Sequence, residues 1–185
     1  MENKTYTVTI YSENQIGLLM QISNIFTRHS LSIWSLSASA SSIEGIHTIT
    51  IITDSPSEKQ ILEVVMQLEK RVDVVKAFYY TNDQIIYREL ALYKMQTAKL
   101  LECGRIEDLL TNYNARIVEM NNVFTVIQKT GKTEETQSLY DELNKYGVMQ
   151  FVRSGRIAVT REKLEPVKDF IAERELEKNK INKEL

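Results

Sequence analysis

The chain has 185 residues, of which 43% are hydrophobic and 26% are charged, a composition typical of a folded globular protein with room for two small domains. Its formal net charge of -2 argues against non-specific binding to nucleic acid or to an anionic membrane surface. The first residues do not resemble a signal peptide and no apolar run reaches membrane-spanning length, so we expect a cytoplasmic protein.

Residues 4–40 predict a strand, a helix and a second strand. Tyr6, Val8 and Ile10 alternate with threonines, and this period of two indicates a strand over residues 4–12 with one apolar face. A helix follows, with an apolar stripe that we expect to face a core: Leu18, Leu19, Ile22, Ile25 and Phe26. A second alternation predicts the next strand, whose apolar face lies opposite serines: Trp34, Leu36, Ala38 and Ala40.

Residues 46–80 complete the first unit. The sequence "IHTITIIT" predicts a third strand, and Pro56 and Ser57 open a helix with four apolar positions: Ile61, Leu62, Val65 and Leu68. Residues 72–80 predict a fourth strand. Because the first two strands keep a Ser/Thr face opposite an apolar one, the βαββαβ order predicts an antiparallel sheet with both helices on one side, which is the ferredoxin-like topology. We place this domain at residues 1–80.

A polar joint at residues 81–84 leads into a second unit of the same order, which we place at residues 85–160. The patterns predict strands at 87–97, 115–120, 123–129 and 148–159, and helices at 101–113 and 133–146. Thr133 is the expected N-cap of the last helix and Gly147 its end. The fold class is therefore α+β, with two ferredoxin-like domains in tandem and a charged tail of helical propensity at 161–185.

The residue types that carry catalysis or bind metals are sparse. His29 and His47 have no second ligand at helical spacing, and Cys103, alone in the chain, allows neither an internal disulfide nor a thiolate zinc cage. We expect Cys103 to be a small structural residue near a helix start. Ser12, His47 and Asp54 offer the side chains of a Ser-His-Asp set, but no nucleophile turn supports it. The chain is therefore predicted not to be an enzyme and to hold no metal or cofactor.

Two binding motifs known from similar folds are also missing. The sequence "TGKTEE", residues 130–135, lacks the earlier glycine of a phosphate loop because position 126 is Val126, so helix capping is its expected role. The aromatic signature of ferredoxin-like RNA-recognition modules is absent as well. We expect no nucleic-acid partner and no membrane partner.

The strongest candidate for a binding site is the turn at residues 12–18. Asn14 and Gln15 offer hydrogen-bonding side chains, and Gly17 opens directly onto a helix whose first backbone N–H groups have no partner within the helix. Because no lysine follows Gly17, the turn suits a small carboxylate better than a polyphosphate. A structural turn, with Gly17 needed for steric reasons, is the alternative.

The same stretch resembles the ACT domain, an amino-acid-sensing βαββαβ module, and in particular the small regulatory subunit of acetohydroxyacid synthase, also called acetolactate synthase. In that family this region is similar to "ENxxGxLxR(I/V)xxxFxxRxxNIxSLxV", which the sequence matches at these positions: Glu13, Asn14, Gly17, Phe26, Ile33, Ser35 and Leu36. Later segments resemble further family signatures in the family's order: "VDVVKA", "YRELALYKM", "ARIVE" and "RSGRIAVTR".

The resemblance implies a non-catalytic subunit. Such a subunit is expected to bind a separate catalytic subunit that holds thiamine diphosphate, a divalent metal and FAD. It would raise the activity of that subunit and make it sensitive to feedback, usually by valine, in branched-chain amino-acid biosynthesis. Paired ACT domains of a homodimer would hold the effector, and the implied effector-binding residues are Asn14, Gln15, Ile16, Gly17, Leu18, Ser32 and Ile33.

Two positions depart from the family pattern. Ser32 stands where the family usually has asparagine, which bears on effector recognition, and Met20 or Gln21 stands where an arginine or similar residue is usual. The tail after Arg161 is longer than in the shorter bacterial members. A free-standing amino-acid sensor that regulates another enzyme or a transcription factor is the alternative function.

Overall fold

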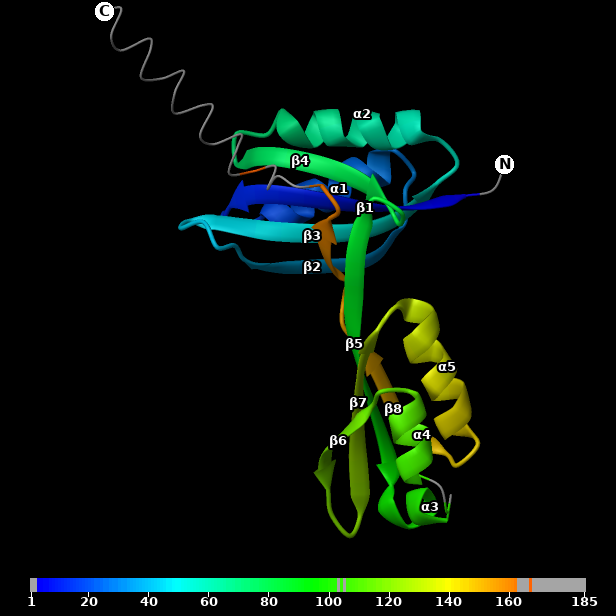
Figure 1. Ribbon diagram of the computed structural model, residues 1–185. Coiled ribbons are helices and arrows are strands. Elements are labelled where there is room, and N and C mark those ends of the chain that lie inside the picture. The colour runs from blue at the N-terminus through cyan, green and yellow to red at the C-terminus, as the bar shows by residue number, and fades with distance from the viewer. Residues whose placement is uncertain (1–2, 103, 105, 163–166, 168–185) are drawn as a thin grey trace, which may run out of the picture. The chain divides into compact units, whose positions relative to one another are not determined.

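The computed structural model describes residues 3–102, 104, 106–162 and 167 (Figure 1). The described residues divide into two compact units, one formed by those within 3–86 together with those from 159 onward, and the other by those within 87–158.

The first unit contains a four-stranded antiparallel sheet in the order β2-β3-β1-β4. Its elements are β1 (Lys4–Glu13), α1 (Leu18–Arg28), β2 (Ile33–Ala40), β3 (Ile46–Ser55), α2 (Glu58–Glu69) and β4 (Val74–Thr81). Figure 1 shows α2 lying along β4, and the core joins both helices to the same face of the sheet. The predicted ferredoxin-like topology is confirmed.

The core of this unit forms where the alternating apolar residues of β1 meet the helices. Tyr6, Val8 and Ile10 are buried together with three stripe residues of α1, Ile22, Ile25 and Phe26, among others. Two predicted stripe residues, Leu19 and Leu62, are instead 44% exposed, because the sheet covers only one side of each helix and they lie beyond the contact.

The apolar face predicted for the second strand lies open in this chain. Trp34 is 70% exposed and Leu36 is 37% exposed, and Ala38 and Ala40 are exposed as well. The reason is position: β2 is an edge strand, and of its residues only Ile33 packs against the core. The strand itself is confirmed.

The second unit repeats the arrangement with a sheet in the order β6-β7-β5-β8, and β9 pairs with β5. Its strands are β5 (Ile85–Gln96), β6 (Arg116–Met120), β7 (Phe124–Gly131), β8 (Val148–Arg153) and β9 (Ile157–Thr160). Its helices are α3 (Thr97–Leu101), α4 (Ile106–Asn112) and α5 (Thr133–Asn144). Tyr93, Met95 and Ile127 from the sheet and Leu139 and Leu143 from α5 form its core.

Two local predictions for this unit are wrong, and one is confirmed. The single helix predicted at 101–113 is wrong: two short helices flank Gly104, whose φ of +63° is a left-handed conformation that a helix cannot continue through. Lys132, not Thr133, is the N-cap of α5, while Gly147, with φ +85°, ends that helical segment as predicted. The predictions for Cys103 and for the tail beyond Glu162, apart from the buried Val167, lie outside the described residues.

Candidate functional site

The turn between β1 and α1 is shaped by Gly17, which adopts φ +84° directly before the helix. The N–H of Leu18 donates to the carbonyl of Gln15 at 3.2 Å and closes the turn. Apart from Gly17 and its two chain neighbours, no atom of the described residues lies within 4 Å of the position that a Cβ on Gly17 would take. The glycine is therefore required by its backbone conformation and not by crowding, and the space beside it is open.

The first turn of α1 has backbone donors to offer. The first intrahelical bond runs from the N–H of Gln21 to the carbonyl of Gly17, so the N–H groups of Leu19 and Met20 precede the helical ladder. No side chain in the described part of the chain caps this helix, and its first turn contains no acidic residue. Together with the positive end of the helix dipole, this arrangement favours a small anion.

Of the seven predicted effector-binding residues, the turn groups Asn14, Gln15, Ile16, Gly17 and Leu18. The first four are exposed, and Leu18 is buried in the core.

Ser32 and Ile33 lie at the other end of the sheet. Ile33 pairs with Thr53, which pairs with Tyr6 near the start of β1, whereas the turn follows Glu13 at the end of β1. At about 3.3 Å per residue, these levels are roughly 20 Å apart. The side chain of Ser32 is exposed, and its carbonyl accepts a hydrogen bond from Thr53 Oγ1 at 2.8 Å. One chain therefore does not bring Ser32 to the turn.

Exposed apolar side chains accompany the turn and the edge strand. Ile16 is fully exposed and Met20 is 64% exposed, and Trp34 and Leu36 line the open face of β2. A group of large apolar side chains in water is a common mark of a surface that contacts another protein.

The structure does not bring Ser12, His47 and Asp54 together as a catalytic set. His47 lies opposite Ser12, but Asp54 lies opposite Thr5, seven residues further along β3. His29 Nδ1 is 3.9 Å from a Glu63 carboxylate oxygen. Within the described ranges, no group of three or more His, Cys, Asp or Glu side chains is placed to hold a metal ion.

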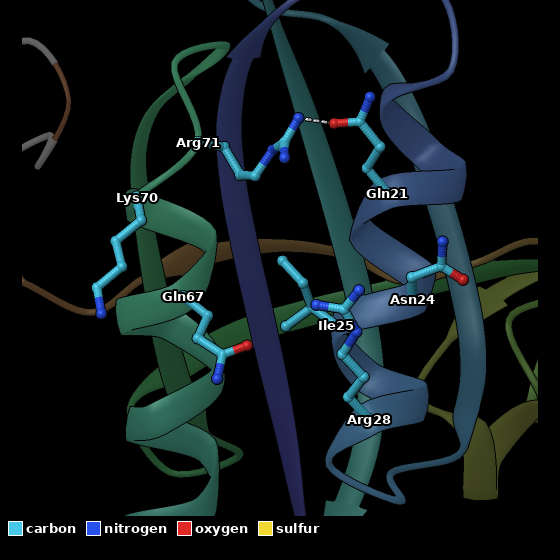
Figure 2. Close-up of a pocket in the computed structure, with 7 residues that line it drawn as sticks. All are labelled: Gln21, Asn24, Ile25, Arg28, Gln67, Lys70 and Arg71. Carbon is cyan, nitrogen blue, oxygen red and sulfur yellow. Dashed lines mark hydrogen bonds between the residues drawn. The ribbon is translucent and has the colours of Figure 1, made fainter.

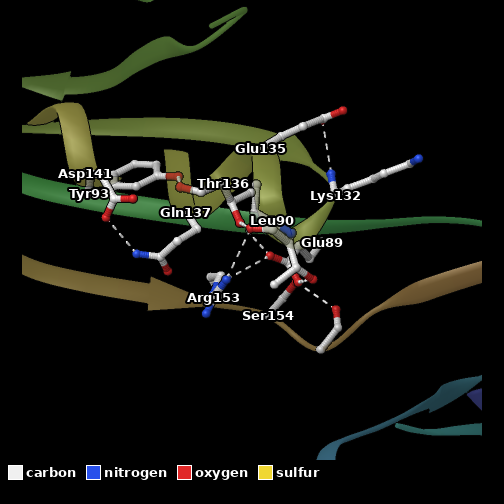
Figure 3. A network of polar contacts seen from close by, with 12 residues as sticks. Glu89, Leu90, Tyr93, Lys132, Glu135, Thr136, Gln137, Asp141, Arg153 and Ser154 are labelled. Carbon is white, nitrogen blue, oxygen red and sulfur yellow. Dashed lines mark hydrogen bonds and ion pairs between the residues drawn. The ribbon is translucent and has the colours of Figure 1, made fainter. Parts of the chain in front are cut away.

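A buried polar network holds the second unit together (Figure 3). The Glu89 carboxylate on β5 accepts hydrogen bonds from Thr133 Oγ1 at 3.0 Å and from Thr136 Oγ1 at 2.5 Å, and Arg153 Nη1 lies 3.5 Å from it. Nearby, burial raises the pKa of the Tyr93 hydroxyl well above its usual value, so it stays protonated and donates to the carbonyl of Thr136 at 2.7 Å. The network joins β5, α5 and β8, and its contacts indicate a structural role.

At the start of α5, the side chain of Glu135 covers the backbone of the "TGKTEE" segment. Glu135 Oε2 accepts a hydrogen bond from the N–H of Lys132 at 3.1 Å, and a Cβ on Gly131 would lie 2.5 Å from the same oxygen. An acidic side chain thus occupies the position that a phosphate would need. The predicted capping role is confirmed, although the cap comes from Glu135 and not from Thr133.

Sequence reasoning did not single out a polar cleft between α1 and α2, because its residues come from two segments far apart in the chain and no local pattern joins them. The residues lining it are Gln21, Asn24, Ile25, Arg28, Gln67, Lys70 and Arg71.

Comparison with known proteins gives consistent matches over both units. A family model described as the AHAS small subunit-like ACT domain matches residues 8–76, and one described as the small subunit of acetolactate synthase matches residues 88–162. The acetolactate synthase small subunit of Bacillus subtilis is 29% identical over 154 residues, which cover 83% of this chain and 89% of that protein. That of Mycolicibacterium smegmatis is 29% identical over 160 residues, 85% of this chain and 91% of that protein.

A solved structure shares the fold of the chain. The crystal structure of the acetolactate synthase small subunit from Thermotoga maritima superposes with a TM-score of 0.77 at 22% identity, and the match covers 87% of this chain and 99% of that one. Among the described residues, the helices are too short or too polar for any to cross a membrane.

Proposed function

The chain belongs to the family of acetolactate synthase small subunits, and we propose that it activates a separate catalytic chain of this enzyme and makes it responsive to a branched-chain amino acid. The observation that carries this proposal is the pair of family models, which follow one another in family order over the two units. The proposal assigns thiamine diphosphate, the divalent metal and FAD to the catalytic chain. It assigns to this chain an amino-acid effector and the contact with its partner.

Valine is our candidate effector, and its carboxylate would accept hydrogen bonds from the backbone N–H groups of Leu19 and Met20 at the start of α1. Three features support this placement: the left-handed conformation of Gly17, the open space beside it and the lack of an acidic side chain in the first turn.

A homodimer through the ACT domains would complete this site. Two copies related by a two-fold axis pair their β2 edge strands antiparallel, so the start of one β2 lies beside the end of the other. Ala40 at the end of β2 pairs with His47, which pairs with Ser12 immediately before the turn. The turn of one copy would therefore lie beside Ser32 and Ile33 of the second copy. The exposed Trp34 and Leu36 would be covered in the same contact.

Regulation would then follow from coupling between two contacts. An effector held by both copies favours one packing of the two ACT domains, and that packing changes how the chain contacts the catalytic subunit. Such coupling is reciprocal, so the catalytic subunit must change the affinity for the effector by the same factor.

Reconstitution with the cognate catalytic chain tests the proposal. Acetolactate formation from pyruvate is measured for each chain alone and for the mixture, with and without valine, and an unrelated protein at equal concentration is the control. We expect no product from this chain alone, a higher turnover in the mixture, and inhibition by valine of the mixture only. Acetolactate formed by this chain alone would contradict the proposal. Valine binding without any effect on the catalytic chain would favour the free-standing sensor.

A further inference from the structure

A second polar site lies between the two helices of the first unit, where a cavity of about 300 Å³ opens between α1 and the end of α2 (Figure 2). Its polar lining comes from Gln21, Asn24 and Arg28 of α1 and from Gln67, Lys70 and Arg71 at the end of α2. We propose that this cleft binds the phosphate group of a small phosphorylated metabolite.

The charge of the lining selects an anion. Arg28, Lys70 and Arg71 are basic residues, and no carboxylate is among the lining residues that the structure describes. Asp73 Oδ2 lies 3.9 Å from Arg71 Nη2, and both side chains are partly exposed. A long, solvent-screened pair of this kind holds the arginine only weakly. The cleft therefore keeps a surplus of positive charge.

Arg71 supplies the most direct indication of a missing acceptor. Its Nε is buried and finds no hydrogen-bond partner among the described residues, although its Nη2 donates to Gln21 Oε1. A buried N–H without an acceptor is unfavourable, and an anion oxygen in the cleft would relieve it. Gln21 meanwhile fixes the direction of the guanidinium.

The side chains that face the cleft suit a tetrahedral anion. Figure 2 shows Arg28 and Gln67 turned into the space between the helices, with Arg71 directed toward Gln21, whereas Lys70 points away from α1. A guanidinium group matches phosphate oxygens through paired N–H donors, as those of Arg28 and Arg71 would from their separate positions along the cleft, and the amide of Gln67 adds a neutral donor. Lys70 contributes charge at longer range. A cavity of about 300 Å³ holds more than the phosphate alone, which is why we assign a small phosphate ester.

This site differs from the turn at Gly17 in its donors. The start of α1 offers backbone N–H groups and no cation, which suits a singly charged carboxylate, whereas the cleft offers guanidinium groups. Cations after the last turn of α2 also stabilise that helix through its dipole, so the test must separate binding from helix stability.

Direct titration of the full chain tests the proposal without the catalytic subunit. Calorimetry and amide chemical shifts follow the addition of inorganic phosphate and of glycerol 3-phosphate at an ionic strength held constant with sodium chloride. We expect saturable binding that Arg28→Gln and Arg71→Gln each weaken by at least about tenfold, since each removes charge-assisted hydrogen bonds. Lys59→Gln is the matched control, because Lys59 is an exposed cation on α2 that does not line the cleft.

Gln67→Glu keeps the size of the side chain and places a negative charge in the cleft, so it should abolish phosphate binding. This variant tests the proposal even if an arginine variant fails to fold. Thermal unfolding followed by circular dichroism shows which variants are folded. Tighter binding of glycerol 3-phosphate than of inorganic phosphate supports a phosphorylated metabolite, and equal binding supports the phosphate site with free phosphate as its ligand. Absence of saturable binding to the parent chain, or binding that survives both Arg28→Gln and Gln67→Glu, would overturn the proposal.

Discussion

The starts of α1 and α5 each follow a glycine, and the two starts differ in what occupies them. At α1, Gly17 leaves open space and the first turn has no acidic residue. At α5, Glu135 folds back onto Gly131 and accepts the N–H of Lys132. A glycine before a helix thus precedes two kinds of helix N-terminus: that of α1 can receive an anion from outside, and that of α5 is occupied by a carboxylate of the chain itself.

The difference follows from one residue type at one position. Glu135 stands three residues after the N-cap of α5, where a carboxylate reaches back to the N-cap N–H, while the corresponding position after Gly17 is Met20. The closed start lies in a unit held by the buried Glu89 network, and the open one lies beside exposed apolar side chains. We infer that the start of α1 is open to a ligand and that the start of α5 is not.

The largest effect that we expect comes from breaking the closed unit at Glu89. Glu89→Ala leaves Arg153 and two threonine hydroxyls without their carboxylate, and it should destabilise the second unit by about 2–4 kcal/mol. Hydrogen exchange with mass spectrometry should show faster exchange across β5, α5 and β8, with β1 and α1 unchanged. Glu119→Ala, at an exposed position on β6, is the control. Equal effects of the two variants would mean that the network contributes nothing special.

The open start is tested by Gly17→Asp. The added carboxylate would repel the effector carboxylate, and a non-glycine residue at φ +84° would strain the turn, so valine inhibition of the reconstituted enzyme should be lost. Gly17→Asn is the matched control, since asparagine tolerates the left-handed conformation better and carries no charge. Association with the catalytic chain should survive both changes. Loss of association together with inhibition would instead indicate a purely structural turn.

Removing the carboxylate of Glu135 should make the start of α5 resemble that of α1. Glu135→Ala removes a cap hydrogen bond and should cost about 1 kcal/mol in local stability, seen as faster exchange of the amides at the start of α5. Glu134→Ala removes the same charge from the same turn, so the difference between the variants isolates the hydrogen bond from the helix dipole. Indistinguishable exchange in the two variants would show that charge alone matters.

Much of the fold could be predicted because period-two and helical spacings are local. The strand at Tyr6, Val8 and Ile10 and the helix carrying Ile22 and Phe26 both formed as expected. The open face of β2 was not predictable from its alternation, since the same pattern serves a buried strand and an edge strand awaiting a partner. The break at Gly104 depends on a left-handed backbone that apolar spacing does not report.

The candidate sites divide in the same way. The Gly17 turn is a contiguous stretch, so it could be identified as a candidate site from its residue types. The roles of Ser32 and of the cleft of Arg28 and Arg71 depend on tertiary or subunit contacts, which no local pattern shows. Pattern reasoning from one chain can place Ser32 at the start of the second strand segment, where β2 begins one residue later, but it cannot say what a second copy brings beside it.

The smallest effect that we expect comes from a substitution at Ser32, which tests the contact between Ser32 and an effector bound at the turn of a second copy. Ser32→Asn restores the residue that the family usually has at this position. The side chain of Ser32 is exposed, and the hydrogen bond from Thr53 goes to its backbone carbonyl, so a larger side chain can enter without disturbing the sheet. Asparagine reaches further than serine, donates through its amide and accepts through its carbonyl.

One additional neutral hydrogen bond to the effector is worth about 0.5–1.5 kcal/mol, which corresponds to roughly 2- to 13-fold in affinity, and a bridging water in the parent protein would reduce the gain. Ser32→Asn should therefore lower the valine concentration that gives half-maximal inhibition of the reconstituted enzyme, with little change in the uninhibited rate. Ser35→Asn, three residues later and within β2, is a control for the general effect of an asparagine in this segment. An unchanged or higher half-maximal concentration would show that Ser32 does not limit effector binding. The open start of α1 would then serve a different ligand, or serve valine without help from the second copy.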